Sequence, residues 1–244
     1  MPNYREFTAP PQLARNVECF WIATQERGSE TIKRVTPDGC ADIIYSRASG
    51  GATLVVVGAM TRFEDFAQPS GLCSVGIRFR PGMWSKMLPV SGPELTNSVM
   101  PLADIWGKRA HTLLAQLDGT DEPPQFAQVL MGAVPVLNDK RLPLERSIEL
   151  LETSHGRFRL DDAAAAAGIG VRQFRRRCID ATGLSPKLLA RILRFRYATE
   201  LIPAMTGRHA ELASECGYAD QSHMIGDFQA FAGRTPMQLA ASFG

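Results

Sequence analysis

Four residues in the segment 171–183 (VRQFRRRCIDATG) have side chains that can recognise the edges of nucleic-acid bases. If this segment is a helix, Phe174 and Cys178 share its core side. The outer face then carries Arg172, Gln173, Arg175 and Arg176. An arginine fork can donate two hydrogen bonds to O6 and N7 of guanine. A basic face is often only solvated, so charge alone supports nucleic-acid binding weakly.

A second polar group lies within residues 209–236 (HAELASECGYADQSHMIGDFQAFAGRTP). The spacing predicts two short helices, the first ending at Gly217 and the second beginning after an N-cap at Asp220. One apolar face of the second helix is formed by Met224, Phe228 and Phe231. Its exposed N-terminal end carries Gln221, Ser222, His223 and Ile225. This pattern fits a helix-turn-helix unit that reads the major groove, or else any helical hairpin.

The segment before residue 183 repeats this design, which indicates an internal duplication. Asp161 is its candidate N-cap, the alanine run 163–167 its first helix, and Gly168 the end of that helix. Aligning Phe174 with Met224 leaves the second copy with one extra residue in its turn.

A long helix should connect the two copies, with Ser185 as N-cap, Pro186 at the first helical position and Pro203 as its stop. The other arginines of this region can contact phosphates or form ion pairs, and they are Arg177, Arg191, Arg194 and Arg196. A preceding helix is predicted after Pro143, ending near Gly156.

Several short sequence motifs, in the same order along the chain, resemble those of the AraC family of bacterial transcription regulators over residues 142–240. They include Gly217-Tyr218, Asp220-Gln221-Ser222-His223, Asp227-Phe228, Gly233-x-x-Pro236, Gly183-x-Ser185-Pro186 and the Arg194-x-x-x-Ala198 pattern. The resemblance implies that the outward residues of both second helices read bases, in successive major grooves. The chain departs from the family at Gly226, where a basic residue is common, so base reading by the second unit is expected to be weaker.

The sequence pattern of residues 1–138 predicts short strands followed by helices. VECFWIAT, KRV, ADIIYS, TLVVVG and CSVGIRF are rich in β-branched and aromatic residues and separated by glycine-containing turns such as 37–39. MWSKML, AHTLLAQL and QFAQVLMGAVPVL look helical. We therefore expect an α+β chain with a β-rich, sandwich-like or barrel-like domain at 1–138 and an all-α domain at 142–244. PDGCADIIY and GIRFRPG resemble a poorly characterised sensor-like domain found ahead of AraC-type segments.

Neither catalysis nor a metal is indicated. Residues 1–110 contain no histidine, the usual ligand of a cupin metal, and no nucleophile or phosphate-binding motif occurs. The five cysteines are scattered, and the acids beside Cys40 should raise its pKa. Cys40 and Cys73 are best explained as small apolar strand residues. Arg78 and Arg80 could bind an anion, but ion pairs are the stronger expectation.

The net charge of +2 is unevenly distributed. Residues 141–200 hold 12 basic and 7 acidic side chains, whereas residues 201–244 hold 2 and 4. The chain has no apolar run long enough to cross a membrane and no signal-peptide pattern, so a cytoplasmic location is expected.

These observations predict a transcription regulator without cofactor. Its expected partners are double-stranded DNA, RNA polymerase, a small-molecule effector and a second copy of the chain. The alternatives are a thiol-based sensor or methyl-accepting repair protein with a DNA-binding tail, and a protein-interaction module that does not bind DNA.

Overall fold

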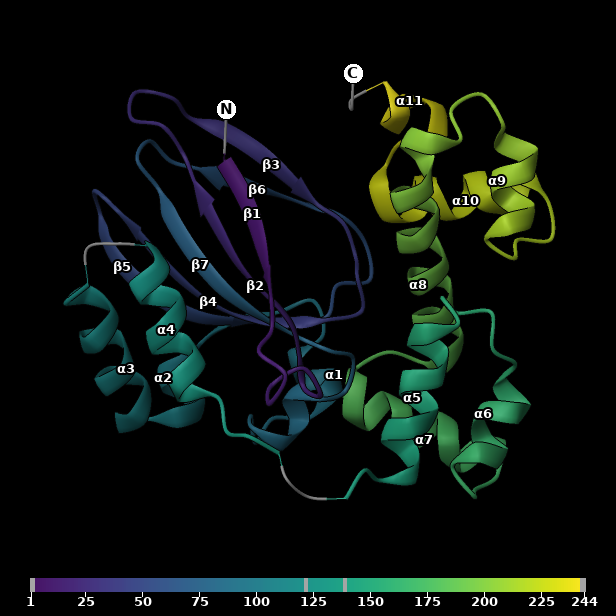
Figure 1. Ribbon diagram of the computed structural model, residues 1–244, viewed down its shortest axis with the longest axis horizontal. Coiled ribbons are helices and arrows are strands. Elements are labelled where there is room, and N and C mark those ends of the chain that lie inside the picture. Colours follow the sequence, from purple (N-terminus) through teal and green to yellow (C-terminus); the bar gives the residue numbers. More distant parts are fainter. Residues whose placement is uncertain (1–2, 121–122, 138–139, 242–244) are drawn as a thin grey trace.

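Two lobes are visible in the computed structural model, which describes residues 3–120, 123–137 and 140–241 (Figure 1). The β-rich lobe runs from β1 to α4, and the helical lobe runs from α5 to α11. The fold is therefore the predicted combination of a β-rich part followed by a helical part.

The β-rich lobe is built on a six-stranded antiparallel sheet in the order β1-β2-β7-β4-β5-β8. Its strands are β1 (Asn3–Thr8), β2 (Val17–Thr24), β7 (Cys73–Phe79), β4 (Ala41–Ala48), β5 (Gly51–Val57) and β8 (Val99–Pro101). A separate two-stranded sheet pairs β3 (Thr31–Val35) with β6 (Glu64–Gln68). All five predicted strands are confirmed. Three strands were not predicted from the sequence: β1 and β6 are rich in polar residues, and β8 is only three residues long.

Helices cover one face of the large sheet (Figure 1). They are α2 (Leu102–Trp106), α3 (Lys108–Asp118) and α4 (Pro123–Ala133). Alternate strand residues such as Phe20, Ile43 and Ile77 point into this core, and Tyr45 packs on Phe126 with ring centroids 5.2 Å apart. The predicted helix MWSKML is only the single 3-10 turn η1 (Trp84–Lys86), because Pro89 follows closely and cannot continue a helix.

The opposite face of the sheet is more polar and lies under the β3–β6 sheet. Trp21 lies flat across Gly76, where a Cβ atom would be 2.2 Å from the indole ring. Lys33 of β3 places its ammonium 4.0 Å from the ring centroid of Tyr4. The short helix α1 (Gly92–Leu95) packs at the end of the large sheet, since a Cβ at Gly58 would be 1.7 Å from the carbonyl oxygen of Leu95.

The helical lobe is organised around the long helix α8 (Pro186–Leu201), which continues into the 3-10 turn η2 (Ile202–Ala204). The other helices are α5 (Pro143–Thr153), α6 (Leu160–Ala166), α7 (Val171–Thr182), α9 (His209–Glu215), α10 (Gln221–Ala232) and α11 (Pro236–Ala240). Phe195 of α8 contacts Phe228 and Phe231 of α10, with ring centroids 4.9 and 5.4 Å apart. A shared core therefore joins the two halves of the lobe.

Most of the predicted helix boundaries of the lobe are confirmed. The side chain of Ser185 accepts from the amide of Leu188, and that of Asp220 accepts from the amide of His223. Gly168 and Gly217 have φ of +66° and +73°. The turn between α9 and α10 is one residue longer than the turn between α6 and α7. The prediction for Asp161 is wrong: α6 begins at Leu160 after Arg159, so Asp161 lies inside the first turn and cannot cap it.

Within the described ranges, no helix is both long and apolar enough to cross a membrane. The polar residues 138–141 before Pro143 predict a linker, and this segment falls partly outside the described ranges.

Candidate nucleic-acid interface

Helix α7 presents a row of arginines to solvent. Phe174, Cys178 and Thr182 are buried, which fixes the opposite face outward. Arg172, Arg175 and Arg176 are exposed as predicted, as is Arg177, while Gln173 is half-buried. In the described part of the chain these four arginines have no ion-pair partner, so their charge is free to attract an anionic ligand.

Helix α10 presents a different surface. Gln221, Ser222 and His223 are exposed at its N-terminal end, whereas Ile225 is half-buried. The ring of His223 meets the edge of Tyr218 with centroids 5.4 Å apart. Gly226 is exposed, and a Cβ placed there would have no atom within 4 Å. This face therefore offers hydrogen-bonding groups but no fixed positive charge.

The arginines of α8 are engaged inside the protein. Arg191 pairs with Asp227 through Nη2 at 2.7 Å. Arg194 donates to the carbonyl oxygen of Gly217 at 3.3 Å and lies over the Tyr218 ring. Of the four arginines predicted to contact phosphates or form ion pairs, Arg177 and Arg194 have no ion-pair partner among the described residues, and of these two only Arg177 is exposed. The ion-pair alternative is the one realised by Arg191.

Asp227 is a further candidate, which the sequence marks only through the Asp227-Phe228 pair of the family resemblance. Its residue exposure is 2%, and its Oδ1 accepts two hydrogen bonds from Arg191. The spacing from Met224 and Phe231 places Asp227 on the apolar face of α10. A carboxylate on an apolar helix face is the sequence feature from which a buried ion pair could have been predicted. Burial raises the pKa of the neighbouring Tyr218, and the charge of Asp227 adds to this effect.

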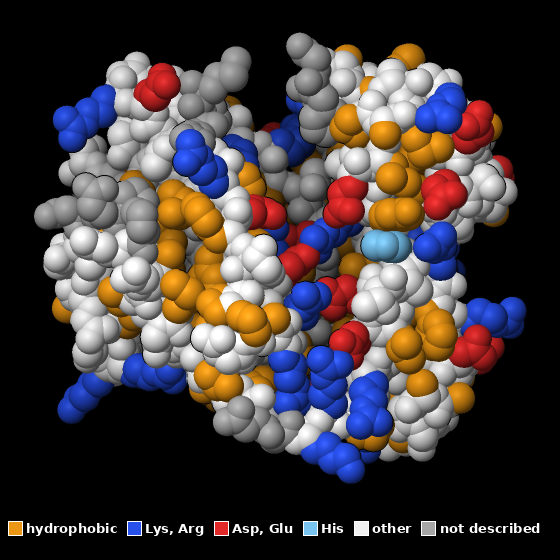
Figure 2. Space-filling view, viewed as in Figure 1, with side chains coloured by type: hydrophobic (Ala, Val, Ile, Leu, Met, Phe, Trp, Pro, Cys, Tyr) orange, Lys and Arg blue, Asp and Glu red, His pale blue; other side chains and the backbone are white. Residues whose placement is uncertain are grey.

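Charged side chains gather along the seam between the lobes, where Figure 2 shows acidic and basic groups side by side. Arg196 of α8 pairs with Glu18 of β2, and Arg80 pairs with Glu152 of α5. Arg80 lies just beyond β7 and does not share a strand face with Arg78. Arg78 pairs with Asp38 at 3.1 Å. The expected ion pairs of Arg78 and Arg80 are therefore confirmed.

Cys40 is buried in this seam. Its Sγ lies 3.2 Å from Oε2 of Glu18, and burial raises its pKa well above the usual value, with a further contribution from Asp38. Burial opposes ionisation of Glu18, but hydrogen bonding from Arg196 lowers its pKa overall. The predicted turn at Pro37-Asp38-Gly39 is present and packs on α8: a Cβ on Gly39 would be 2.9 Å from Leu189.

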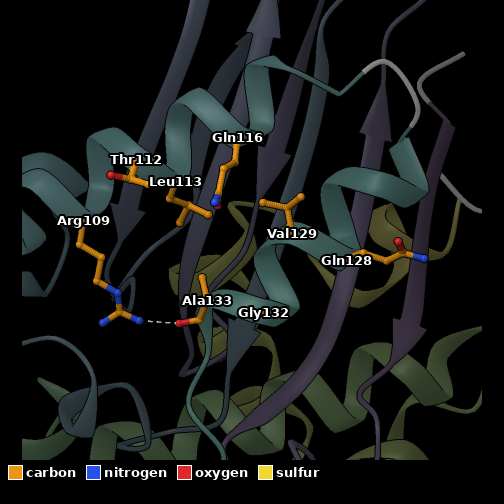
Figure 3. A pocket seen from close by; sticks show the side chains of 8 residues that line it. All are labelled: Arg109, Thr112, Leu113, Gln116, Gln128, Val129, Gly132 and Ala133. Carbon is orange, nitrogen blue, oxygen red and sulfur yellow. Dashed lines mark hydrogen bonds between the residues drawn. The ribbon is translucent and has the colours of Figure 1, made fainter.

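An open groove of about 790 Å³ runs between α3 and α4 of the β-rich lobe (Figure 3). Leu113, Val129 and Ala133 line its apolar part, and Arg109 closes one end by donating to the carbonyl oxygen of Ala133 at 2.7 Å. Among the described residues, no group of three or more His, Cys, Asp or Glu side chains is arranged to hold a metal ion.

The comparisons with known proteins divide the chain in the same way. Residues 163–242 match the family described as helix-turn-helix domain, and residues 5–101 match a domain of unknown function (DUF6597). No curated protein sequence matches the chain significantly. Residues 163–242 form an AraC-type helix-turn-helix domain. This domain is of the kind that DNA-binding transcription regulators carry.

Three solved structures illustrate the similarity. The DNA-binding domain of AdpA in complex with a target DNA is 27% identical, with a TM-score of 0.39, over 42% of this chain and 94% of that one. The C-terminal domain of AraT, a response regulator from Geobacillus stearothermophilus, is 21% identical, with a TM-score of 0.38, over 42% and 88%. ToxT from Vibrio cholerae O395 is 11% identical, with a TM-score of 0.44, over 90% and 95%.

Proposed function

We propose that the chain is a sequence-specific regulator that binds double-stranded DNA chiefly through α7. The supporting observation is the set of four exposed arginines on that helix with no ion-pair partner in the described residues. Arg172, Arg175 and Arg176 contact bases, with Gln173 beside them, and Arg177 contacts phosphate. Helix α10 reads the adjacent groove through Gln221, Ser222, His223 and Ile225, with less electrostatic attraction. Bound in this way, the protein holds RNA polymerase at a promoter or blocks it.

The test uses a duplex selected from a random library with the full chain. Its affinity should fall steeply with salt, because each arginine–phosphate contact releases condensed counterions and contributes about −0.9 to the slope of log K against log salt. Replacing Arg177 with Ala should make that slope shallower by about one. Binding that stays flat between low and moderate salt would reject the proposal.

We also propose that a small organic effector controls DNA binding through the β-rich lobe. The supporting feature is the polar face between the six-stranded sheet and β3–β6, where Trp21 donates to Asp42 at 2.7 Å and Arg78 and Lys33 are close by. Such a mixture of an aromatic ring and charged groups suits a small polar ligand. Native mass spectrometry of the purified chain should show an additional organic mass. A stoichiometric transition metal instead would contradict the expected absence of a cofactor.

We also propose that a second copy of the chain packs on the α3–α4 groove. Residues 123–133 of α4 contain no charged side chain, so a two-fold axis beside this helix creates no like-charge repulsion within the α4 pair. A Cβ at Gly132 meets no atom within 4 Å, so Gly132→Glu should fold normally and shift a dimer toward monomer. Light scattering measures the mass, with Gly132→Ala as control. A dimer that survives Gly132→Glu would place the interface elsewhere.

The thiol-based alternative remains the second candidate from another class. It requires an accessible thiolate, and burial raises the pKa of Cys40 and Cys73. The burial of these thiols therefore favours a DNA-binding regulator over a thiol-based sensor.

A further inference from the structure

The two recognition helices end at equivalent glycines. Gly183 is the C-cap of α7 and Gly233 is the C-cap of α10, with φ of +74° and +63°. Both occupy the same position relative to the aligned pair Phe174 and Met224, and both precede a capped helix that begins with proline. These glycines are therefore the same structural point in the duplicated units.

The β-rich lobe contacts the first of these points through α1. A Cβ on Gly92 would lie 2.3 Å from the carbonyl oxygen of Ile179 and 2.4 Å from the amide nitrogen of Gly183. A Cβ on Gly183 would lie 1.9 Å from Oγ1 of Thr96. The backbones of α1 and the end of α7 are thus in direct contact, which only glycine at both positions allows.

The β-rich lobe contacts the second cap glycine, Gly233, through Arg34 of β3 and through Phe63 in the loop between β5 and β6. Arg34 donates from Nη1 to the carbonyl oxygen of Ala232 at 3.2 Å, the position where a cation complements the dipole of α10. A Cβ on Gly233 would lie 2.7 Å from the ring of Phe63, and the Arg34 guanidinium stacks 4.1 Å from that ring. Asp65 holds Arg34 with two hydrogen bonds of 2.8 and 2.7 Å.

Neither contact covers a base-reading residue. The exposed arginines of α7 and the exposed Gln221, Ser222 and His223 of α10 belong to the N-terminal parts and outer faces of their helices, away from the cap glycines. The β-rich lobe therefore does not block the candidate interface in this arrangement. Any influence of the lobe on DNA binding must act through the placement of the two helices.

The two contacting elements belong to different layers of the β-rich lobe. Helix α1 is packed against the six-stranded sheet through Leu95 and Gly58. Arg34 lies on the separate β3–β6 sheet, next to Lys33, which reaches the six-stranded sheet at the Tyr4 ring. A movement of one sheet against the other would shift one cap glycine relative to the other.

We propose that the β-rich lobe sets the separation and relative rotation of the two recognition helices by holding both cap glycines, α1 at Gly183 and Arg34 with Phe63 at Gly233. A ligand entering between the two sheets would then change DNA binding by altering half-site geometry rather than by uncovering the interface. This inference rests on the proposed DNA-binding function. It assigns Arg34 and Phe63 a positioning role, with no contact to DNA.

The experiment measures half-site spacing preference with the full chain, using the selected duplex and a derivative with one base pair inserted between its two half-sites. One base pair rotates a half-site by roughly 35°, so the wild type should bind the derivative about tenfold more weakly. Phe63→Ala and Arg34→Ala should each reduce this discrimination to about threefold or less, because the end of α10 loses its contact with the β-rich lobe. Arg62→Ala, which removes an exposed arginine from the same loop, is the matched control and should behave as wild type.

The outcomes separate this inference from the function on which it rests. If the wild type binds no duplex, the proposed function fails. If all variants bind with the wild-type discrimination, only the positioning role fails. Should Phe63→Ala unfold, Arg34→Ala decides alone, since the Arg34 side chain is partly exposed and belongs to neither large hydrophobic core.

Discussion

Arg191 of the linker helix α8 holds the buried carboxylate of Asp227 on the recognition helix α10, with two hydrogen bonds of 3.0 and 2.7 Å to the same oxygen. The guanidinium also lies 5.2 Å from the ring centroid of Phe231. This pair joins the linker helix to the second helix-turn-helix unit. A residue that the sequence assigned to phosphate contact or an ion pair therefore has a structural role.

Arg191→Ala should cost more stability than Asp227→Ala. The first change leaves a carboxylate of 2% exposure without its cation, which costs about 3 kcal/mol. The second leaves the Arg191 side chain, at 34% exposure, able to reach water and should cost about 1–2 kcal/mol. Urea unfolding of the full chain measures both. A larger loss of unfolding free energy for Asp227→Ala than for Arg191→Ala would mean that the buried Asp227 carboxylate does not need the Arg191 cation.

Asp220→Ala should destabilise the second unit by about 1 kcal/mol, because the amide of His223 loses its capping acceptor at 2.7 Å. Asp161→Ala is the matched control in the first unit. Asp161 lies within the first turn of α6 and does not act as its N-cap, so only a charge–dipole effect of about 0.5 kcal/mol is expected. Equal unfolding curves for the two variants would remove Asp220 as a cap.

The duplicated helical lobe was largely predictable because its signals are local. Cap residues, cap glycines and apolar spacing gave α7, α8 and α10, and even the extra residue of the second turn. The error at Asp161 arose because Arg159, without a capping side chain, precedes the helix. Contacts between the lobes could not be predicted, since Glu18 and Arg196, or Arg34 and Ala232, are far apart in sequence and their pairing depends on the tertiary arrangement.

Cysteine reactivity tests the alternative based on thiol chemistry. Of the five cysteines, all within described residues, Cys73 is half-buried and the others are buried. Burial raises the pKa of Cys40 well above its usual value and that of Cys178 to about 12. Iodoacetamide at mildly alkaline pH should therefore label Cys73 first and Cys40 only after unfolding. Rapid labelling of Cys40 in the native chain would revive the thiol-sensor reading.

Gly226→Arg should strengthen DNA binding. A Cβ at this exposed position meets no atom within 4 Å, so the longer side chain can reach a phosphate or a base beside α10. Arginine also favours helix over glycine by nearly 1 kcal/mol, and Gly226→Ala controls for that gain in stability. Fluorescence anisotropy on the selected duplex compares the three proteins. If Gly226→Ala binds as tightly as Gly226→Arg, the added charge contributes nothing.

Footprinting of Arg176→Ala beside His223→Ala on one selected duplex tests the central claim most directly. Arg176 is an exposed arginine of α7 with no ion-pair partner in the described residues, whereas His223 stands on the uncharged face of α10. Loss of the Arg176 fork should cost about 1–3 kcal/mol and weaken protection across the site, with the greatest loss at the half-site of the first unit. His223→Ala should leave that half-site protected. Protection that survives Arg176→Ala and disappears with His223→Ala would contradict the claim that α7 is the principal DNA-binding helix.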